Sequence, residues 1–203
     1  MPRRNSLRSE NLRRVLAQDS ARIMAEHGIQ DFLAAKRKAA ARYGQVEAAS
    51  LPSNSEIEAA LIEYQRLFAG RSHDTRLRQQ RSAALGIMEL LAPFQPRLVG
   101  PVLTGTATAH SDVQLHVFAE RPETVAFALM DRGIDHDITE RKLRLQREVT
   151  GAQPGLRFDF ESYTFDVIIF PLDGIRQAPS SPVDGRPMRR ADRTEVELLL
   201  GGE

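Results

Sequence analysis

Residues 98–118, LVGPVLTGTATAHSDVQLHVF, decide the fold of this chain. They predict a buried strand that ends in a Gly-Pro pair, a turn rich in glycine and threonine, and a second strand that begins at Asp112. Apolar and polar residues alternate along the second strand, so Asp112, Gln114 and His116 share the face opposite the apolar side chains. An acid, an amide and an imidazole on one strand face, after a glycine-containing turn, indicate a candidate site.

This stretch resembles the signature of the nucleotidyltransferase superfamily, the polymerase-beta-like fold. In that family a Gly-Ser pair ends the first strand and helps to hold a nucleoside triphosphate, and an Asp-hydrophobic-Asp triplet stands on the second strand. A third carboxylate comes from a later strand, a place that Asp166 in FDVIIF takes here. The resemblance covers residues 81–171 and aligns the remaining motifs with Gly100-Pro101, Gly105-Thr106 and Asp112-Val113-Gln114. The segment AKRKAAAR, residues 35–42, taken with its helix, also resembles bacterial proteins with the same kind of degenerate domain.

The resemblance implies a nucleotide site with a function for each aligned residue. Asp112 and Asp166 would be catalytic residues and ligands of Mg2+, and His116 would act with them as a further ligand or as an acid/base near neutral pH. The residues that would contact the nucleoside triphosphate are Gly100, Gly105, Thr106, His110 and Gln114.

Four of these residues also have a purely structural interpretation. Asp112 would begin a strand, Asp166 would face solvent on an edge strand, His116 would be a hydrogen-bonded structural residue, and His110 would be a solvated loop residue. Asp159 and Glu161 are rival donors of the third carboxylate.

Two departures from the family pattern weaken the case for catalysis. Pro101 offers neither a hydroxyl nor an N–H to a phosphate. Gln114 is neutral where the family has an anion, and Mg2+ prefers charged oxygen ligands. The sequence therefore predicts a degenerate site that holds at most one metal ion weakly.

Composition limits the remaining function classes. The 203 residues contain no cysteine, and this excludes disulfides, thiolate metal sites and cysteine catalysis. The net charge of +1 indicates no particular partner. No apolar run approaches the length that spans a membrane, so no membrane partner is expected. The N-terminus is basic but lacks the apolar core of a signal peptide, and a cytoplasmic location is expected.

Hydrophobic periodicity predicts an α+β protein. Residues 1–92 should form a helical region, and residues 93–203 a nucleotidyltransferase-like mixed sheet with flanking helices, a C-terminal loop and a final helix. The helices are expected over residues 6–27, 30–43, 53–70, 74–91, 122–131 and 192–200, with a turn over residues 71–75. After the first two strands, further strands are expected over residues 134–139, 142–146, 156–160 and 163–170, the last two joined in a hairpin around Glu161-Ser162.

Two segments outside the sheet have both a functional and a structural interpretation. AKRKAAAR, residues 35–42, is either a patch for RNA or a protein partner or a solvated helix face. The structureless stretch over residues 171–191 is either a loose connection or a lid that brings arginines to a phosphate, namely Arg176, Arg186, Arg189 or Arg190.

Three functions follow from the sequence. The first is a nucleotidyltransferase-fold protein with a degenerate site that binds a nucleotide, RNA or a protein partner. The second is an active Mg2+-dependent enzyme that transfers a nucleoside monophosphate to a protein, RNA or small-molecule hydroxyl. The third is a helical adaptor in which the sheet serves as a scaffold.

Overall fold

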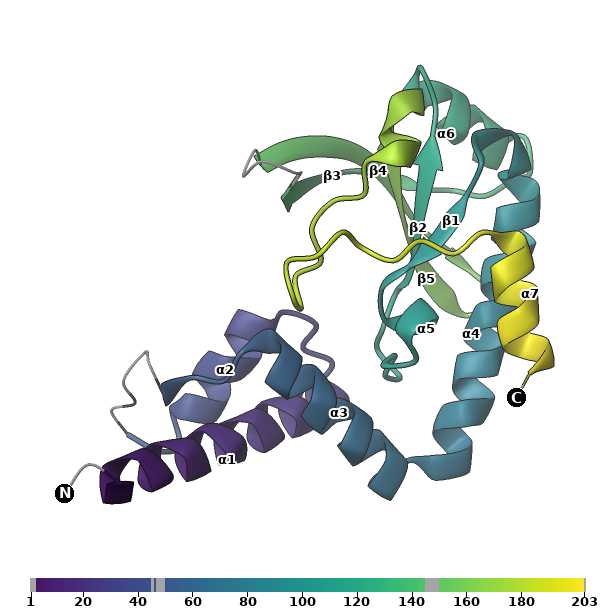
Figure 1. The fold of residues 1–203 in the computed structure, drawn as a ribbon. Coiled ribbons are helices and arrows are strands. Elements are labelled where there is room, and N and C mark those ends of the chain that lie inside the picture. Colours follow the sequence, from purple (N-terminus) through teal and green to yellow (C-terminus); the bar gives the residue numbers. More distant parts are fainter. Residues whose placement is uncertain (1–2, 45, 47–49, 145–149, 203) are drawn as a thin grey trace. The chain divides into compact units, whose positions relative to one another are not determined.

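The computed structural model describes residues 3–44, 46, 50–144 and 150–202 and shows an α+β protein (Figure 1). The chain divides into two compact units. The helical unit comprises Met1–Asp74 with the short segments Thr108–His110 and Pro182–Asp184. The sheet unit comprises Thr75–Ala107, Ser111–Ser181 and Gly185–Glu203.

The helical unit contains α1 (Arg3–His27), α2 (Phe32–Ala40) and α3 (Asn54–Phe68). Its core is formed by small and branched side chains from all three helices, including Leu16, Ile23, Ala35 and Ile57. The expected capping box before α3 is confirmed, because the Ser53 side chain accepts from the Glu56 amide while the Glu56 carboxylate accepts from the Ser53 amide.

The sheet unit is built on a five-stranded mixed sheet in the order β1-β2-β5-β4-β3. The strands are β1 (Arg97–Val99), β2 (Val113–Phe118), β3 (Asp137–Arg144), β4 (Thr150–Phe160) and β5 (Tyr163–Phe170). β2 and β5 run parallel, and the other neighbouring strands are antiparallel. Because β2 and β5 are parallel neighbours, Gln114 on β2 lies beside Asp166 on β5.

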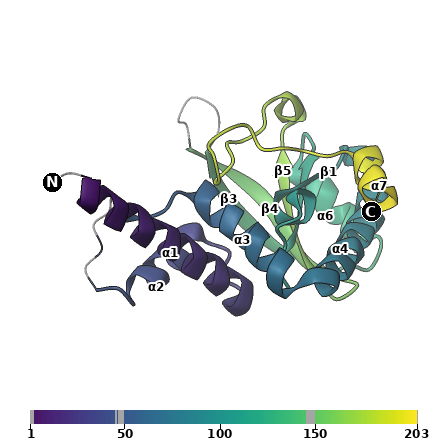
Figure 2. The ribbon, with the colours of Figure 1, turned by 60° about the horizontal axis from the view of Figure 1, so that its bottom comes forward.

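One face of this sheet, which we call the core face, is covered by helices. They are α4 (Gly70–Leu90), α6 (Pro122–Met130) and α7 (Arg193–Gly201). α7 lies beside α4 in both views (Figure 1 and Figure 2), with Arg193 Nη1 3.7 Å from Glu89 Oε1. Apolar side chains that alternate along β2 and β5, such as Leu115 and Val167, pack on these helices. The opposite face, which we call the site face, carries Gln114, His116 and Asp166.

Local signals predict most elements, and the differences have physical causes. The expected turn after β1 instead contains a short helix, α5 (Gly100–Thr104), because Pro101 favours the first turn of a helix and Gly105, at φ +85°, caps its end. The expected turn over residues 71–75 is also helical, since α4 begins at Gly70.

The two short strands expected over residues 134–139 and 142–146 form one strand, β3, although residues 145 and 146 lie outside the described part of the chain. The hairpin of β4 and β5 is confirmed, with its two turn residues Glu161 and Ser162 at φ +48° and +69°. After β5 the stretch expected to be structureless contains a 3-10 helix, η3 (Leu172–Arg176). A second 3-10 helix, η2 (Ala92–Phe94), follows α4.

Candidate functional site

A polar row crosses the middle of the site face. Gln114 on β2 lies opposite Asp166 on β5, and Asp166 lies opposite Arg157 on β4. Asp112 precedes β2 by one residue, two positions before Gln114. The alternation predicts that Asp112, Gln114 and His116 share a face, and the resemblance implies that Asp166 lies near Asp112. The pairing of β2 with β5 places Gln114 and Asp166 side by side.

Both carboxylates of the row are engaged by arginines. Arg141 on β3 bonds Asp166 with Nη2 2.7 Å from Oδ2 and Nε 3.4 Å from Oδ1. Arg157 bonds Asp112 with Nη1 3.0 Å from Oδ2 and Nη2 3.2 Å from Oδ1. Two-point pairing of this kind fixes the orientation of both groups and uses the acceptor positions of the carboxylate that face the arginine.

The Asp166–Arg141 ion pair is more deeply buried than the Asp112–Arg157 ion pair. The side chain of Asp166 is only 4 % exposed, whereas that of Arg141 is 41 % exposed. The alternative in which Asp166 faces solvent on an edge strand is therefore wrong, because β5 is an inner strand of the sheet. A buried carboxylate requires a paired cation, and Arg141 is that cation.

The donor set fits two Mg2+ ions poorly. Magnesium binds hard, charged oxygens in octahedral geometry, but the two carboxylates already accept from guanidinium groups and Gln114 is neutral. Among the residues that the structure describes, no group of three or more His, Asp or Glu is placed to hold a metal ion. The arginines place fixed positive charge where the family resemblance expects metal ions.

The glycines and threonine of the expected nucleotide site shape the backbone around α5. Gly100 has φ +69°, and a Cβ added there would collide with Gln114 Oε1, so the Gln114 side chain lies directly against the Gly100 backbone. The amides of Gly105 and Thr106 donate to the Pro101 carbonyl at 2.9 and 3.0 Å and end α5. The structure therefore brings Gly100 and Gln114 together and assigns a capping role to Gly105 and Thr106.

His116 is buried on the site face, where it contacts Phe170 and Arg190. Its ring centroid lies 4.7 Å from that of Phe170, and its Nδ1 accepts from Arg190 Nε at 3.0 Å. Burial, with repulsion from Arg190 in addition, lowers the pKa of His116 to about 3. The imidazole is therefore neutral at physiological pH with its proton on Nε2, and it is engaged in packing.

Arg190 links His116 to the segment that contains η3. Its guanidinium carbon lies 5.1 and 4.9 Å from the ring centroids of Phe118 and Phe170. Its Nη1 donates to the carbonyls of Gly174 and Ile175 at 2.8 and 3.3 Å. Burial lowers the pKa of Arg190 to about 10, with Arg97 repulsion adding to the effect. Arg190 thus holds η3 against the sheet.

His110 belongs to the helical unit. Its carbonyl accepts from Gln30 Nε2 at 2.7 Å, and its ring packs so closely on Gly28 that a Cβ there would lie 2.8 Å from His110 Cγ. In the same unit, Arg37 and Lys38 are exposed in the last turn of α2, where they complement the helix dipole. A role of α2 in binding RNA or protein stays a prediction.

The two arginines of the row are not among the residues that the sequence indicates as a site. Arg157 stands between Leu156 and Phe158, so period-two alternation places it on the polar face of β4. That signal could have identified it, and Asp159, the rival third acid, follows on the same face and accepts from Thr164 at 2.7 Å. Glu161, the other rival acid, lies in the β4–β5 turn. Arg141 carries no such local signal, because it reaches Asp166 across β4.

Comparison of the chain with protein-family models, with curated proteins and with solved structures finds no match. Over the described part of the chain, no helix combines the length and the apolar character needed to cross a membrane.

Proposed function

We propose that this protein is a non-catalytic nucleotide-binding protein with a nucleotidyltransferase-like sheet. The observation that carries the proposal is the pairing of Asp112 with Arg157 and of Asp166 with Arg141. In the family that the sequence resembles, Mg2+ ions neutralise the phosphates of the nucleotide. Here each guanidinium is paired with a carboxylate, so the formal charges of the row cancel and the row offers N–H donors without a metal ion.

The arginines retain donors for a ligand. Asp166 engages Nε and Nη2 of Arg141, which leaves Nη1, and Asp112 engages Nη1 and Nη2 of Arg157, which leaves Nε. Both arginine side chains are about two-fifths exposed, at 41 % and 40 %. Guanidinium N–H groups in this fixed orientation suit the oxygens of a phosphate.

Calorimetric titration of the full chain with each of the four nucleoside triphosphates, in Mg2+ and in chelator, tests the proposal. We expect one nucleotide to bind with the same affinity in both conditions. Arg157→Gln should weaken this binding roughly tenfold, since a hydrogen bond to a charged group contributes about 1.5–3 kcal/mol. Arg132→Gln, on the core side of the sheet unit, serves as the matched control. Absence of binding in every titration would refute the proposal.

The alternative of an active enzyme is favoured by one observation: Asp112 and Asp166 are associated with adjacent parallel strands and share a face. If that alternative is correct, nucleotide binding will require Mg2+ and will be lost in Asp112→Ala. The protein will then also transfer a nucleoside monophosphate to an acceptor hydroxyl, with positioning and charge neutralisation supplying most of the rate.

A further inference from the structure

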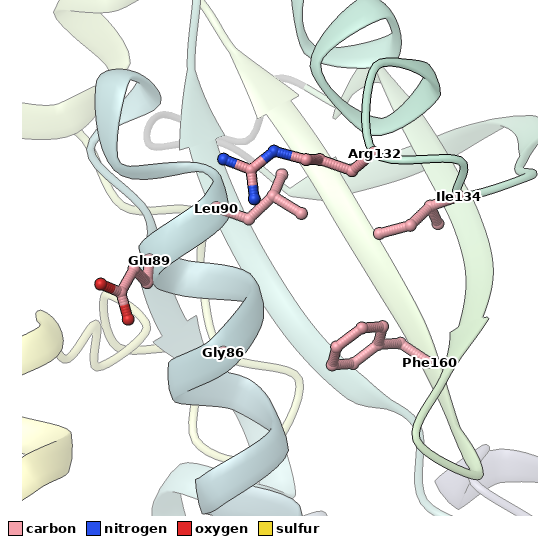
Figure 3. Close-up of a pocket in the computed structure, with 6 residues that line it drawn as sticks. All are labelled: Gly86, Glu89, Leu90, Arg132, Ile134 and Phe160. Atoms are coloured by element: carbon pink, nitrogen blue, oxygen red, sulfur yellow. The ribbon is translucent and has the colours of Figure 1, made fainter.

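A cavity of about 460 Å³ opens on the core side of the sheet unit, away from the polar row. It is lined by Gly86, Glu89 and Leu90 of α4, by Arg132 and Ile134 after α6, and by Phe160 at the end of β4 (Figure 3). Its volume lies within the range of small-molecule sites in proteins, roughly 300–1,000 Å³.

Three of the lining side chains are apolar and are held by contacts with the core. Leu90, Ile134 and Phe160 are half-buried and pack on the main core, and the Phe160 ring stands edge-on to Phe165 at a centroid distance of 6.2 Å. Figure 3 shows the side chains of Ile134 and Phe160 pointing toward α4. All of these residues belong to one compact unit.

Gly86 keeps the α4 side of the cavity open. Its backbone is helical, and a Cβ added there would lie 3.6 Å from Phe160 Cε1, an ordinary contact. The backbone therefore does not require glycine at this position, although glycine in a helix costs about 1 kcal/mol relative to alanine. The gap between Gly86 and the Phe160 ring therefore admits one methyl group, and Gly86 forms part of the cavity wall beside that ring.

A single uncompensated charge stands at the cavity. Arg132 lines the cavity, and within the described residues its side chain has no hydrogen-bond or ion-pair partner. Glu89 points away from the cavity in the same view, and its carboxylate lies 3.7 Å from Arg193 Nη1. A ligand in this cavity therefore meets the apolar side chains of Leu90, Ile134 and Phe160 and the positive charge of Arg132.

We propose that the cavity binds a small aromatic carboxylate. The aromatic ring lies against Leu90, Ile134 and Phe160, and the carboxylate pairs with Arg132. This site is independent of the proposed nucleotide site, because its residues lie on the core side of the sheet and share none of the polar row.

Amide NMR of the full chain, titrated with 2-naphthoate, tests the proposal. We expect saturable shifts at Leu90, Ile134 and Phe160, and weaker binding of the uncharged analogue 2-naphthylmethanol. Arg132→Gln should weaken naphthoate binding roughly fivefold, the size expected for an exposed ion pair, and remove the preference for the acid. Arg121→Gln, an arginine at the other end of α6, should leave both unchanged.

Gly86→Ala separates shape from charge. The added methyl group should narrow the cavity and weaken both naphthalene ligands while it stabilises α4, so lost binding cannot be attributed to unfolding. Gly201→Ala, which adds a methyl group to open space near the end of α7, is the matched control and should bind normally. Equal binding of the acid and the alcohol, unaffected by Arg132→Gln, would overturn the proposal, and so would the absence of saturable shifts at the cavity residues.

Discussion

Replacing His116 with asparagine should remove most of the acid sensitivity of the sheet unit. The pKa of His116 is lowered from its ordinary 6.5 to about 3 in the folded protein, because the imidazole is buried and Arg190 repels its cation. Asparagine places an amide oxygen near the position of Nδ1, so it can still accept from Arg190 Nε. It does not titrate.

The direction and size of the effect follow from proton linkage. Between pH 3 and pH 6.5 the unfolded chain binds a proton at His116 that the folded chain does not bind. Stability from this residue is therefore complete above pH 6.5 and is lost as the pH falls toward 3. With about 1.4 kcal/mol per pKa unit, lowering the pH from 7 to 4.5 should cost the wild type about 2.5 kcal/mol at this site.

Urea unfolding at both pH values measures this loss. The amide NMR signals of β2 and β5 should be followed, because circular dichroism would sum two compact units that need not unfold together. At pH 7, His116→Asn should be less stable than the wild type by about 1–3 kcal/mol, since it loses ring contacts with Phe170. At pH 4.5 the two should nearly converge. His27→Gln, at the exposed end of α1, controls for loss of a histidine, and equal acid sensitivity in His116→Asn and the wild type would refute the reasoning.

Three further substitutions test contacts of the fold by urea unfolding. Arg190→Ala should destabilise the sheet unit by about 3 kcal/mol, because two carbonyls lose a donor and two aromatic rings lose a cation; an effect below 1 kcal/mol would contradict this. Changing Glu161 to Asn and Ser162 to Gly should raise stability by about 1–2 kcal/mol, since these residues tolerate the positive φ values of the β4–β5 turn; a loss would show that the turn differs. Ser53→Ala should destabilise the helical unit by about 1 kcal/mol through its capping box, with no change in the signals of β2 and β5.

Features encoded within a few neighbouring residues could be predicted from the sequence. The capping box at Ser53 and the hairpin of β4 and β5 are examples, because each depends on side chains or alternation within one segment. α5 was missed since a Gly-Pro pair followed by Gly105 is equally typical of a turn and of a short capped helix.

The electrostatics of the candidate site could not be predicted, because they depend on strand register. Arg141 is opposite Gln153 on β4, whereas Asp166 is opposite Arg157, so the Arg141 side chain reaches Asp166 across β4 and away from its own register partner. No pattern within one segment of the sequence predicts that β3 and β5 both pair with β4 in this register. The sequence placed the acids on one face, and only the sheet pairing shows that arginines engage them.

The grouping of α4 with the sheet has a similar origin. Its periodic apolar face is visible in the sequence, but the partner of that face is not. In the structure Ile87 and Met88 pack with Leu115 and Val167 of the sheet, so the compact units meet in sequence near residue 74.

Paramagnetic broadening by Mn2+ tests the central claim most directly, because Mn2+ replaces Mg2+ at carboxylate sites and broadens the amide signals near it. The account predicts that Gln114 and Asp166 in the wild type keep their signals. In the double variant Arg141→Gln, Arg157→Gln, the same Mn2+ concentration should broaden them, since both carboxylates are then free of arginine. Broadening in the wild type that disappears in Asp112→Ala would contradict the claim that arginines occupy the place of the metal ions.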